Sequence, residues 1–259
     1  MPRRRGYEDD DRDVERGGKS EPNSAFGEDD DGFIFDKATR KDFVAKVYGL
    51  LTIQLAITFA IIFALNYVEA VREFIEDYFW VVFIFMVVQL IIYCTIVCVR
   101  RVRMSYPTNL ILLTFHTLVF AGLAAWISAR YDIAVIWLAF MATAVITLLV
   151  TAFAKFTPWD VTGCGMFICI AFIAVSVFSL IAFIVSFFIY IPIIHLIISG
   201  IMVALLSFYL MYMTQLILGG RKQEIDSDEV VLAVIILYTT IIDIFLHLLH
   251  LIGACMSDE

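Results

Sequence analysis

The chain has 259 residues, of which 62% are hydrophobic and only 17% charged, and its mean hydropathy is +0.91. Soluble domains carry about 45–50% apolar and about 25% charged residues, so this composition excludes an ordinary soluble globule and a small disulfide-stabilised secreted module. The formal net charge of −8 leaves no basic face for phosphates and excludes a nucleic-acid binder.

Charge is concentrated at the N-terminus, where the first 42 positions hold half of the 18 basic and half of the 26 acidic residues. Residues 1–32 combine dense mixed charge with few apolar side chains, and such a segment cannot offset the entropy of a fixed chain. We therefore expect a disordered acidic tail over residues 1–32. Acids follow Arg3–Arg5 where a signal peptide would need an apolar core, so we assign targeting to the first membrane span.

Seven apolar segments, each close to the length of about 20 residues that a membrane helix needs, follow the tail. They are 43–65, 79–99, 108–128, 133–154, 161–185, 193–216 and 230–252. The uncharged stretch from Val161 to Gly220 is too long for one span, and the proline in Tyr190–Pro192 predicts the break. Asp226 and Glu229 have capping-box spacing and predict the start of the last helix. The sequence thus predicts an all-α integral membrane domain of seven helices over residues 33–253, followed by a short tail over 254–259.

Lysine and arginine gather in alternate loops, which predicts orientation because basic loops stay in the cytosol. The N-terminus and these basic loops are therefore expected on the cytosolic side. Seven full crossings would place the C-terminus on the far side, whereas a re-entrant last span would return it to the cytosol. The basic loop residues are Arg100, Arg101, Arg103, Lys155, Arg221 and Lys222.

Polar residues inside the spans are few. Gln54, Gln89 and Gln215 are expected to hydrogen-bond between helices. Cys94 and Cys98 are one helical turn apart, but no further soft ligand lies near them in the sequence, so we expect no metal site.

Asp243 is the exception, because it lies about 20 Å along the last helix from Glu229 with no basic residue nearby. A carboxylate at this depth must find a partner, face water or be protonated. Helical spacing places four further polar residues on the same face: Thr239, Thr240, His247 and His250. This stripe favours a cation or proton pathway. Two alternatives stay open: a polar network that fixes the helix in the bundle, and an Asp–His–His metal site, which lacks a ligand from another helix.

Four segments have distinctive sequences: Asp42–Leu55 (DFVAKVYGLLTIQL), Arg101–Leu110 (RVRMSYPTNL), Thr214–Gly220 (TQLILGG) and Leu237–Leu246 (LYTTIIDIFL). Together they resemble the transmembrane BAX-inhibitor-motif family, and its animal lifeguard branch in particular. The resemblance implies seven helices with the last one central, wrapped by the other six. It also implies a Ca²⁺ leak that lowers store content, restraint of cell death, and a pair of carboxylates on the last two helices as the pH-sensitive element.

The chain departs from that pattern at both acidic positions, which are Met213 and Thr240 here. Neither side chain can titrate, so the acid pair cannot be carried over. Asp243 lies one turn beyond Thr240. Either it takes over the role of the missing acid pair, or the chain keeps the fold of the family and has lost the pore. Because the Met213 side chain is apolar and carries no charge, it predicts either a leak that is always open or an apolar plug that excludes water and blocks conduction.

We therefore expect a multi-pass membrane protein that regulates calcium homeostasis and restrains apoptosis as a Ca²⁺ leak channel with Asp243 in its path. The alternative is a non-conducting adaptor that inhibits cell death through protein partners. No nucleophile elbow or pair of intramembrane aspartates is present in the sequence, so we expect no enzyme. The expected partners are the lipid bilayer, Ca²⁺ as a permeant ion and cell-death regulatory proteins, with no cofactor and no nucleic acid. We expect the endoplasmic reticulum or Golgi membrane rather than the plasma membrane.

Overall fold

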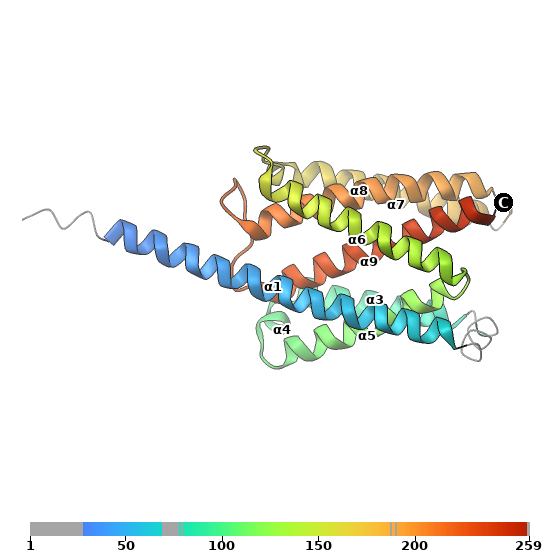
Figure 1. Ribbon diagram of the computed structural model, residues 1–259, viewed down its shortest axis with the longest axis horizontal. Coiled ribbons are helices and arrows are strands. Elements are labelled where there is room, and N and C mark those ends of the chain that lie inside the picture. The colour runs from blue at the N-terminus through green and yellow to red at the C-terminus, as the bar shows by residue number, and fades with distance from the viewer. Residues whose placement is uncertain (1–27, 69–77, 79, 187, 190, 258–259) are drawn as a thin grey trace, which may run out of the picture. The chain divides into compact units, whose positions relative to one another are not determined.

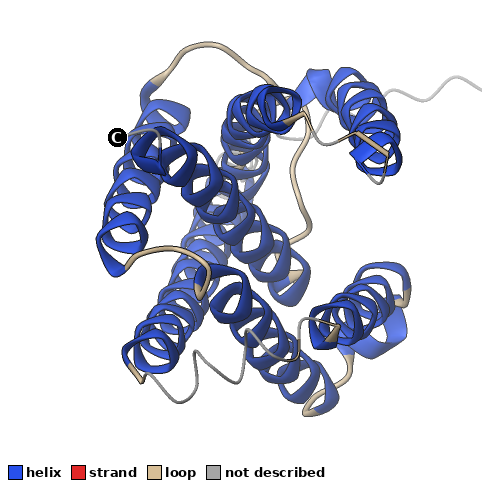
Figure 2. Ribbon diagram, turned by 90° about the vertical axis from the view of Figure 1, so that its right-hand side faces the viewer, coloured by secondary structure: helices blue, strands red, loops and turns tan. Residues whose placement is uncertain are grey.

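A computed structural model of the chain describes residues 28–68, 78, 80–186, 188–189 and 191–257. Within these residues the structure is helical with no strand (Figure 2). The helices are α1 (Glu28–Tyr67), α3 (Val81–Cys98), α4 (Arg100–Met104), α5 (Thr108–Ser128), α6 (Ile133–Phe156), the short 3₁₀ helix η2 (Thr162–Cys164), α7 (Gly165–Ser186), α8 (Pro192–Leu218) and α9 (Val230–Ser257). Most of the expected tail, residues 1–27, lies outside the described residues.

Seven of the helical segments are long and apolar enough to cross a membrane, which confirms the seven predicted spans. Pro192 is the first residue of α8, as the predicted break requires. The two largest departures from the predicted boundaries are at the start of α1 and the end of α9. Helix α1 begins at Glu28 inside the expected tail, since an acidic sequence suits a helix N-terminus. Helix α9 continues to Ser257 because 254–256 are helix-compatible apolar residues.

Residues Ala38–Glu259 form one compact unit, and α9 is its central helix. In the most apolar window of α9, 61% of the residues are buried inside the protein, the highest share among the seven spans. Helix α9 packs against α8, α6 and α5, and it runs between the α6–α8 pair and the α3–α5 pair (Figure 1). The resemblance had implied six surrounding helices, but α7 packs chiefly on α8, and only 6% of its most apolar window is buried.

The outer surface of the bundle is apolar. Leu148 and Phe167, for example, are 70% and 74% exposed. A contiguous apolar surface of this kind is incompatible with water and fits the lipid phase of a membrane.

Aromatic rings join α1 to α6 and α9. The rings of Phe59 and Phe140 meet edge to face with centroids 4.4 Å apart, and Phe59 packs against Phe245 of α9 at 5.5 Å. Phe63 stacks on Trp137 at 4.2 Å. Such pairs add to the burial of apolar area and hold α1 against the bundle.

A buried ion pair fastens the start of α9 to the segment between α3 and α5. Arg103 Nε donates to Glu229 Oε2 at 2.5 Å and its Nη2 donates to Oε1 at 3.1 Å, and both side chains are largely buried. The predicted span 230–252 placed the start of α9 correctly at Val230, but the capping box is not formed, because Glu229 lies before the helix and its carboxylate binds arginine instead of the backbone at Asp226. A bidentate, charge-assisted bond is stronger than a bond to a neutral backbone donor, which explains the difference.

Candidate functional site

Asp243 lies about four turns into α9 and lines a cavity of about 460 Å³ formed by α3, α7, α8 and α9. The structure gives its carboxylate no hydrogen bond or ion pair with any other described residue. Of the described residues that line this cavity, Asp243 is the one carboxylic acid, and no lysine or arginine faces it. A carboxylate at membrane depth is costly without water or a cation, so this cavity is the candidate site.

Aromatic side chains form much of the cavity wall. Tyr93 reaches it from α3, Phe172 from α7, and Tyr209 and Tyr212 from α8. Tyr209 and Tyr212 stack with ring centroids 6.1 Å apart, and Phe172 meets Tyr209 edge-on at 5.4 Å. The hydroxyls of the three tyrosines make no hydrogen bond to a described residue.

Two threonines complete the polar part of the cavity. Thr240 donates its hydroxyl hydrogen to the carbonyl oxygen of Ile236 at 2.7 Å, which leaves the oxygen lone pairs available. The Thr239 hydroxyl is buried without a hydrogen-bond partner among the described residues. The structure thus brings Thr239, Thr240 and Asp243 together in one place.

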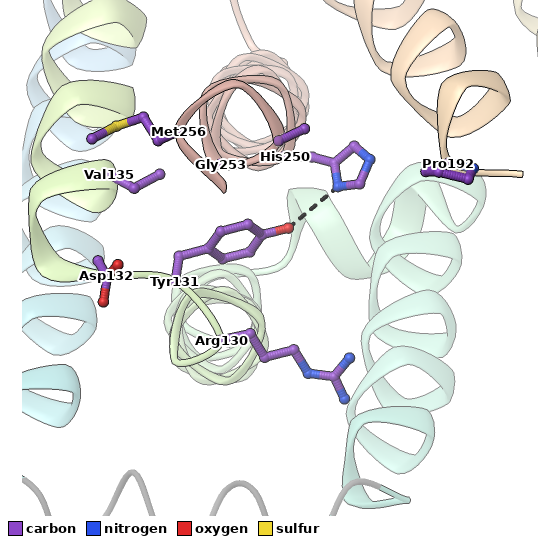
Figure 3. A pocket seen from close by; sticks show the side chains of 9 residues that line it. Arg130, Tyr131, Asp132, Val135, Pro192, His250, Gly253 and Met256 are labelled. Carbon is purple, nitrogen blue, oxygen red and sulfur yellow. Dashed lines mark hydrogen bonds between the residues drawn. The ribbon is translucent and has the colours of Figure 1, made fainter. Parts of the chain in front are cut away.

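The two histidines of the predicted stripe lie elsewhere. His247 Nδ1 is 3.5 Å from the Ser199 hydroxyl of α8. His250 Nδ1 is 3.3 Å from the hydroxyl of Tyr131, which points at the imidazole in a separate cavity of about 360 Å³ (Figure 3). His250 is about 10 Å along the helix from Asp243, so a shared face does not give a shared site.

Met213 and Thr240, the two positions at which the resemblance places acids, lie in different surroundings. Met213 is buried, belongs to the apolar core and does not line the cavity of Asp243. Thr240 is buried but polar and faces that cavity. Among the described residues no group of three histidine, cysteine, aspartate or glutamate side chains could hold a metal ion.

Gln54 and Gln89 each join two helices. Gln54 Nε2 donates to Thr117 Oγ1 at 2.5 Å and links α1 to α5. Gln89 Nε2 lies 2.6 Å from His116 Nε2 and links α3 to α5. Both pairs are buried, where an unpaired amide would be costly.

Gln215, the third glutamine, lies near the end of α8 and serves mainly a loop. Its Nε2 donates to the carbonyl oxygen of Trp159 at 2.9 Å, and its Oε1 accepts from the Val161 amide at 3.0 Å. A weaker contact of 3.4 Å reaches the carbonyl oxygen of Ala154 at the end of α6. The expected bond between helices is therefore chiefly a bond to the segment between α6 and η2, because Gln215 is close enough to the helix end to reach unpaired loop amides.

The three tyrosines of the cavity and Tyr238 were not predicted from the sequence. The Tyr238 hydroxyl is fully buried, 2.8 Å from the Thr58 hydroxyl of α1, and donates to the carbonyl oxygen of Thr117 on α5 at 3.3 Å. A signal did exist for Tyr209 and Tyr212, which are three residues apart and so share a face of α8. Nothing in the sequence indicates that Tyr93 of α3 joins them.

Comparison with known proteins gives a consistent result. The family described as "Inhibitor of apoptosis-promoting Bax1" matches residues 40–257. The chain is 32% identical to protein lifeguard 3 of Mus musculus over 219 residues, which are 85% of this chain and 71% of that protein. It is 32% identical to protein lifeguard 3 of Homo sapiens over 84% of this chain and 70% of that protein. It is 27% identical to protein lifeguard 4 of Mus musculus over 83% of this chain and 86% of that protein.

Proposed function

Since the chain belongs to the Bax1-inhibitor family of multi-pass membrane proteins, we propose that it restrains apoptosis by letting Ca²⁺ leak from an internal store, with Asp243 as the cation site. The family is one of membrane regulators rather than enzymes, and we propose no catalytic reaction. The observation that carries the proposal is the unpaired carboxylate of Asp243 in its cavity inside the bundle.

The chemistry of the cavity suits the passage of Ca²⁺ better than tight binding of the ion. Ca²⁺ takes six to eight oxygen ligands, and tight sites supply several carboxylates. Here one carboxylate is joined by Thr240 and three tyrosines, whose hydroxyls are neutral. A conducting site must bind the ion weakly enough to release it, which one acid with neutral oxygens provides.

We propose that the protein lies in the endoplasmic reticulum or Golgi membrane with the N-terminus in the cytosol. The basic residues that connect spans at one end of the bundle, among them Arg103 and Arg221, support the cytosolic N-terminus, and the family resemblance supports an internal membrane. Orientation can be tested with variants that keep one cysteine, since Cys98 and Cys255 are both exposed and lie at the C-terminal ends of α3 and α9, two spans expected to cross the membrane in opposite directions. In sealed vesicles with the cytosolic face outward, an impermeant maleimide should label Cys98 and spare Cys255. Labelling of Cys255 would mean that the last span returns to the cytosolic side.

The functional proposal is tested in cells with a Ca²⁺ indicator in the lumen of the store. Expression of the wild-type chain should lower the store content and speed its decline after the pumps are inhibited. Asp243→Asn should abolish both effects, because the amide carries no charge, and Asp243→Glu should retain them. A store content in Asp243→Asn cells equal to that in wild-type cells would refute the leak through this residue.

A second candidate function is a non-conducting adaptor that binds cell-death regulatory proteins. It is favoured by Met213, which fills the family's acidic position with a dry apolar side chain packed in the core. In that case deletion of residues 1–27 should remove protection against cell death, and Asp243→Asn should leave it intact. The leak predicts the opposite pattern.

A further inference from the structure

We propose that the cavity around Asp243 binds an organic ammonium ion, held by the carboxylate and by the faces of the surrounding aromatic rings. The site is that of the proposed leak, but the inference does not depend on Ca²⁺ conduction. A chain that conducts nothing could bind this ligand equally well.

The charge of the cavity calls for a cation. Asp243 has no ion-pair partner among the described residues, and none of the residues that line its cavity is basic. An uncompensated carboxylate in such surroundings is stabilised by any cation that reaches it. A single negative charge matches the single positive charge of an ammonium group.

The wall of the cavity distinguishes an organic cation from a metal ion. Tyr93, Phe172, Tyr209 and Tyr212 all line it, and the last three form one continuous aromatic cluster. Aromatic faces attract weakly hydrated organic cations through the ring quadrupole, and cages of this composition recognise quaternary ammonium groups. A hard, strongly hydrated metal ion prefers oxygen ligands and gains less from such a wall.

The size of the cavity also fits an organic ligand. Its volume of about 460 Å³ lies in the range of small-molecule pockets and exceeds what a bare metal ion fills. Gly165 widens the approach, since a Cβ there would lie 2.7 Å from the Tyr212 hydroxyl. A groove of about 390 Å³ beside Phe59 and Phe140 has no charged residue among those that line it.

The remaining polar atoms indicate a hydroxyl or N–H group on the ligand. The hydroxyls of Tyr93, Tyr209 and Tyr212, which line the cavity, have no hydrogen-bond partner among the described residues. A ligand that carries a hydroxyl a few atoms from its ammonium group would pair with the hydroxyl of Tyr93 or Tyr212 while its charge lies against Asp243. Choline has this chemistry and is the appropriate probe.

Binding is measured by calorimetry on the full chain in nanodiscs of phosphatidylglycerol, which carries no competing choline group. The paired probes are choline and 3,3-dimethylbutan-1-ol, its neutral isostere. Choline should bind at least about tenfold more tightly than the isostere. Asp243→Asn should weaken choline binding by about tenfold or more, whereas Asp226→Asn in the exposed loop before α9 should have no effect.

A ring-specific pair of variants separates cation–π attraction from hydrogen bonding. Tyr209→Phe keeps the ring and should leave affinity within about twofold, while Tyr209→Leu removes it and should weaken binding from about threefold to about thirtyfold. Equal losses in both variants, equal affinity for the neutral isostere, or no choline binding up to about 10 mM would each overturn the inference.

A parallel Ca²⁺ flux measurement keeps this inference and the proposed function apart. If the leak exists, choline should block it by occupying the cavity. Choline binding without Ca²⁺ flux would support the ammonium site and refute the leak. Flux without choline binding would refute the ammonium site and leave the leak.

Discussion

Glu229→Gln should be among the most destabilising single changes in the loops of this protein. The Glu229 side chain is 7% exposed and that of Arg103 is 12% exposed, and two hydrogen bonds of 2.5 and 3.1 Å join them. Arg103 also donates from Nη1 to the carbonyl oxygen of Val97 at 2.7 Å. The substitution leaves the guanidinium buried without a compensating charge, which costs about 3–5 kcal/mol.

The chain supplies a matched control. Arg40 and Glu224 form an ion pair of similar length, 2.6 Å, but the Glu224 side chain is 56% exposed. Exposed pairs contribute about 0–1 kcal/mol because solvent screens them, so Glu224→Gln should have little effect. The substitution is the same in both variants, but Glu229 is buried and pairs with both Arg103 and Arg100, whereas Glu224 is exposed and pairs with Arg40.

The assay is thermal unfolding of purified protein in detergent, followed by tryptophan fluorescence. For a chain of this size a loss of 1 kcal/mol lowers Tm by about 2–4 °C, so Glu229→Gln should lower it by roughly 6–20 °C and Glu224→Gln by at most about 4 °C. Equal shifts for the two variants would refute the argument that burial makes the Arg103–Glu229 pair structural.

Two further predictions concern packing and pH. Gly253→Ala should destabilise the protein by about 1–3 kcal/mol, because a Cβ at this position collides with the ring of Tyr131. Gly200→Ala in α8 should stabilise the protein by up to about 1 kcal/mol, because a Cβ there meets no other atom. Thermal unfolding of both variants tests the pair, and destabilisation by both would contradict it. Hydrogen bonds from Thr162 and the Lys222 amide lower the pKa of Asp160 below its ordinary value of about 4. The ionised Asp160 carboxylate therefore stabilises the loop fully at pH values above the ordinary pKa, and this stabilisation is lost as the pH falls through the lowered pKa. The protection factor of the Thr162 amide, which is its exchange relative to the intrinsic rate at each pH, should fall over that acidic range in the wild type and stay constant in Asp160→Asn.

The seven spans could be predicted from the sequence because a membrane helix is a one-dimensional property of length and hydropathy. The turn at Pro192 was predictable because local backbone chemistry decides it, and the start of α9 at Val230 was predictable because the apolar run begins there. The assignment to the family followed from four short motifs, and comparison over residues 40–257 confirms it.

The composition of the candidate site could be predicted only in part. Thr239, Thr240 and Asp243 are close in sequence and occupy one cavity, but helical spacing could not show that His250 faces Tyr131 in another. Contacts of long sequence separation decide such details. The aromatic wall brings α3, α7 and α8 together, and no local pattern reports it.

Glu229 illustrates how a long-range partner overrides a local pattern. Its spacing from Asp226 is that of a capping box, which would start the helix directly after Asp226, but α9 begins at Val230 and Glu229 precedes it. The carboxylate binds Arg103, which is 126 positions earlier in the chain. Hydropathy predicted where the span begins, and tertiary packing determined the partner of the side chain.

The central claim is that Asp243 holds a cation in transit, and Ca²⁺ flux into liposomes containing the purified chain tests it most directly. Wild type, Asp243→Asn and Asp243→Glu are compared from about pH 6 to about pH 8, beside a conducting relative as a control for reconstitution. The account predicts flux in the wild type and in Asp243→Glu, and none in a folded Asp243→Asn. Wild-type protein that is folded yet impermeable beside a conducting control, or an Asp243→Asn variant that conducts like the wild type, would contradict it.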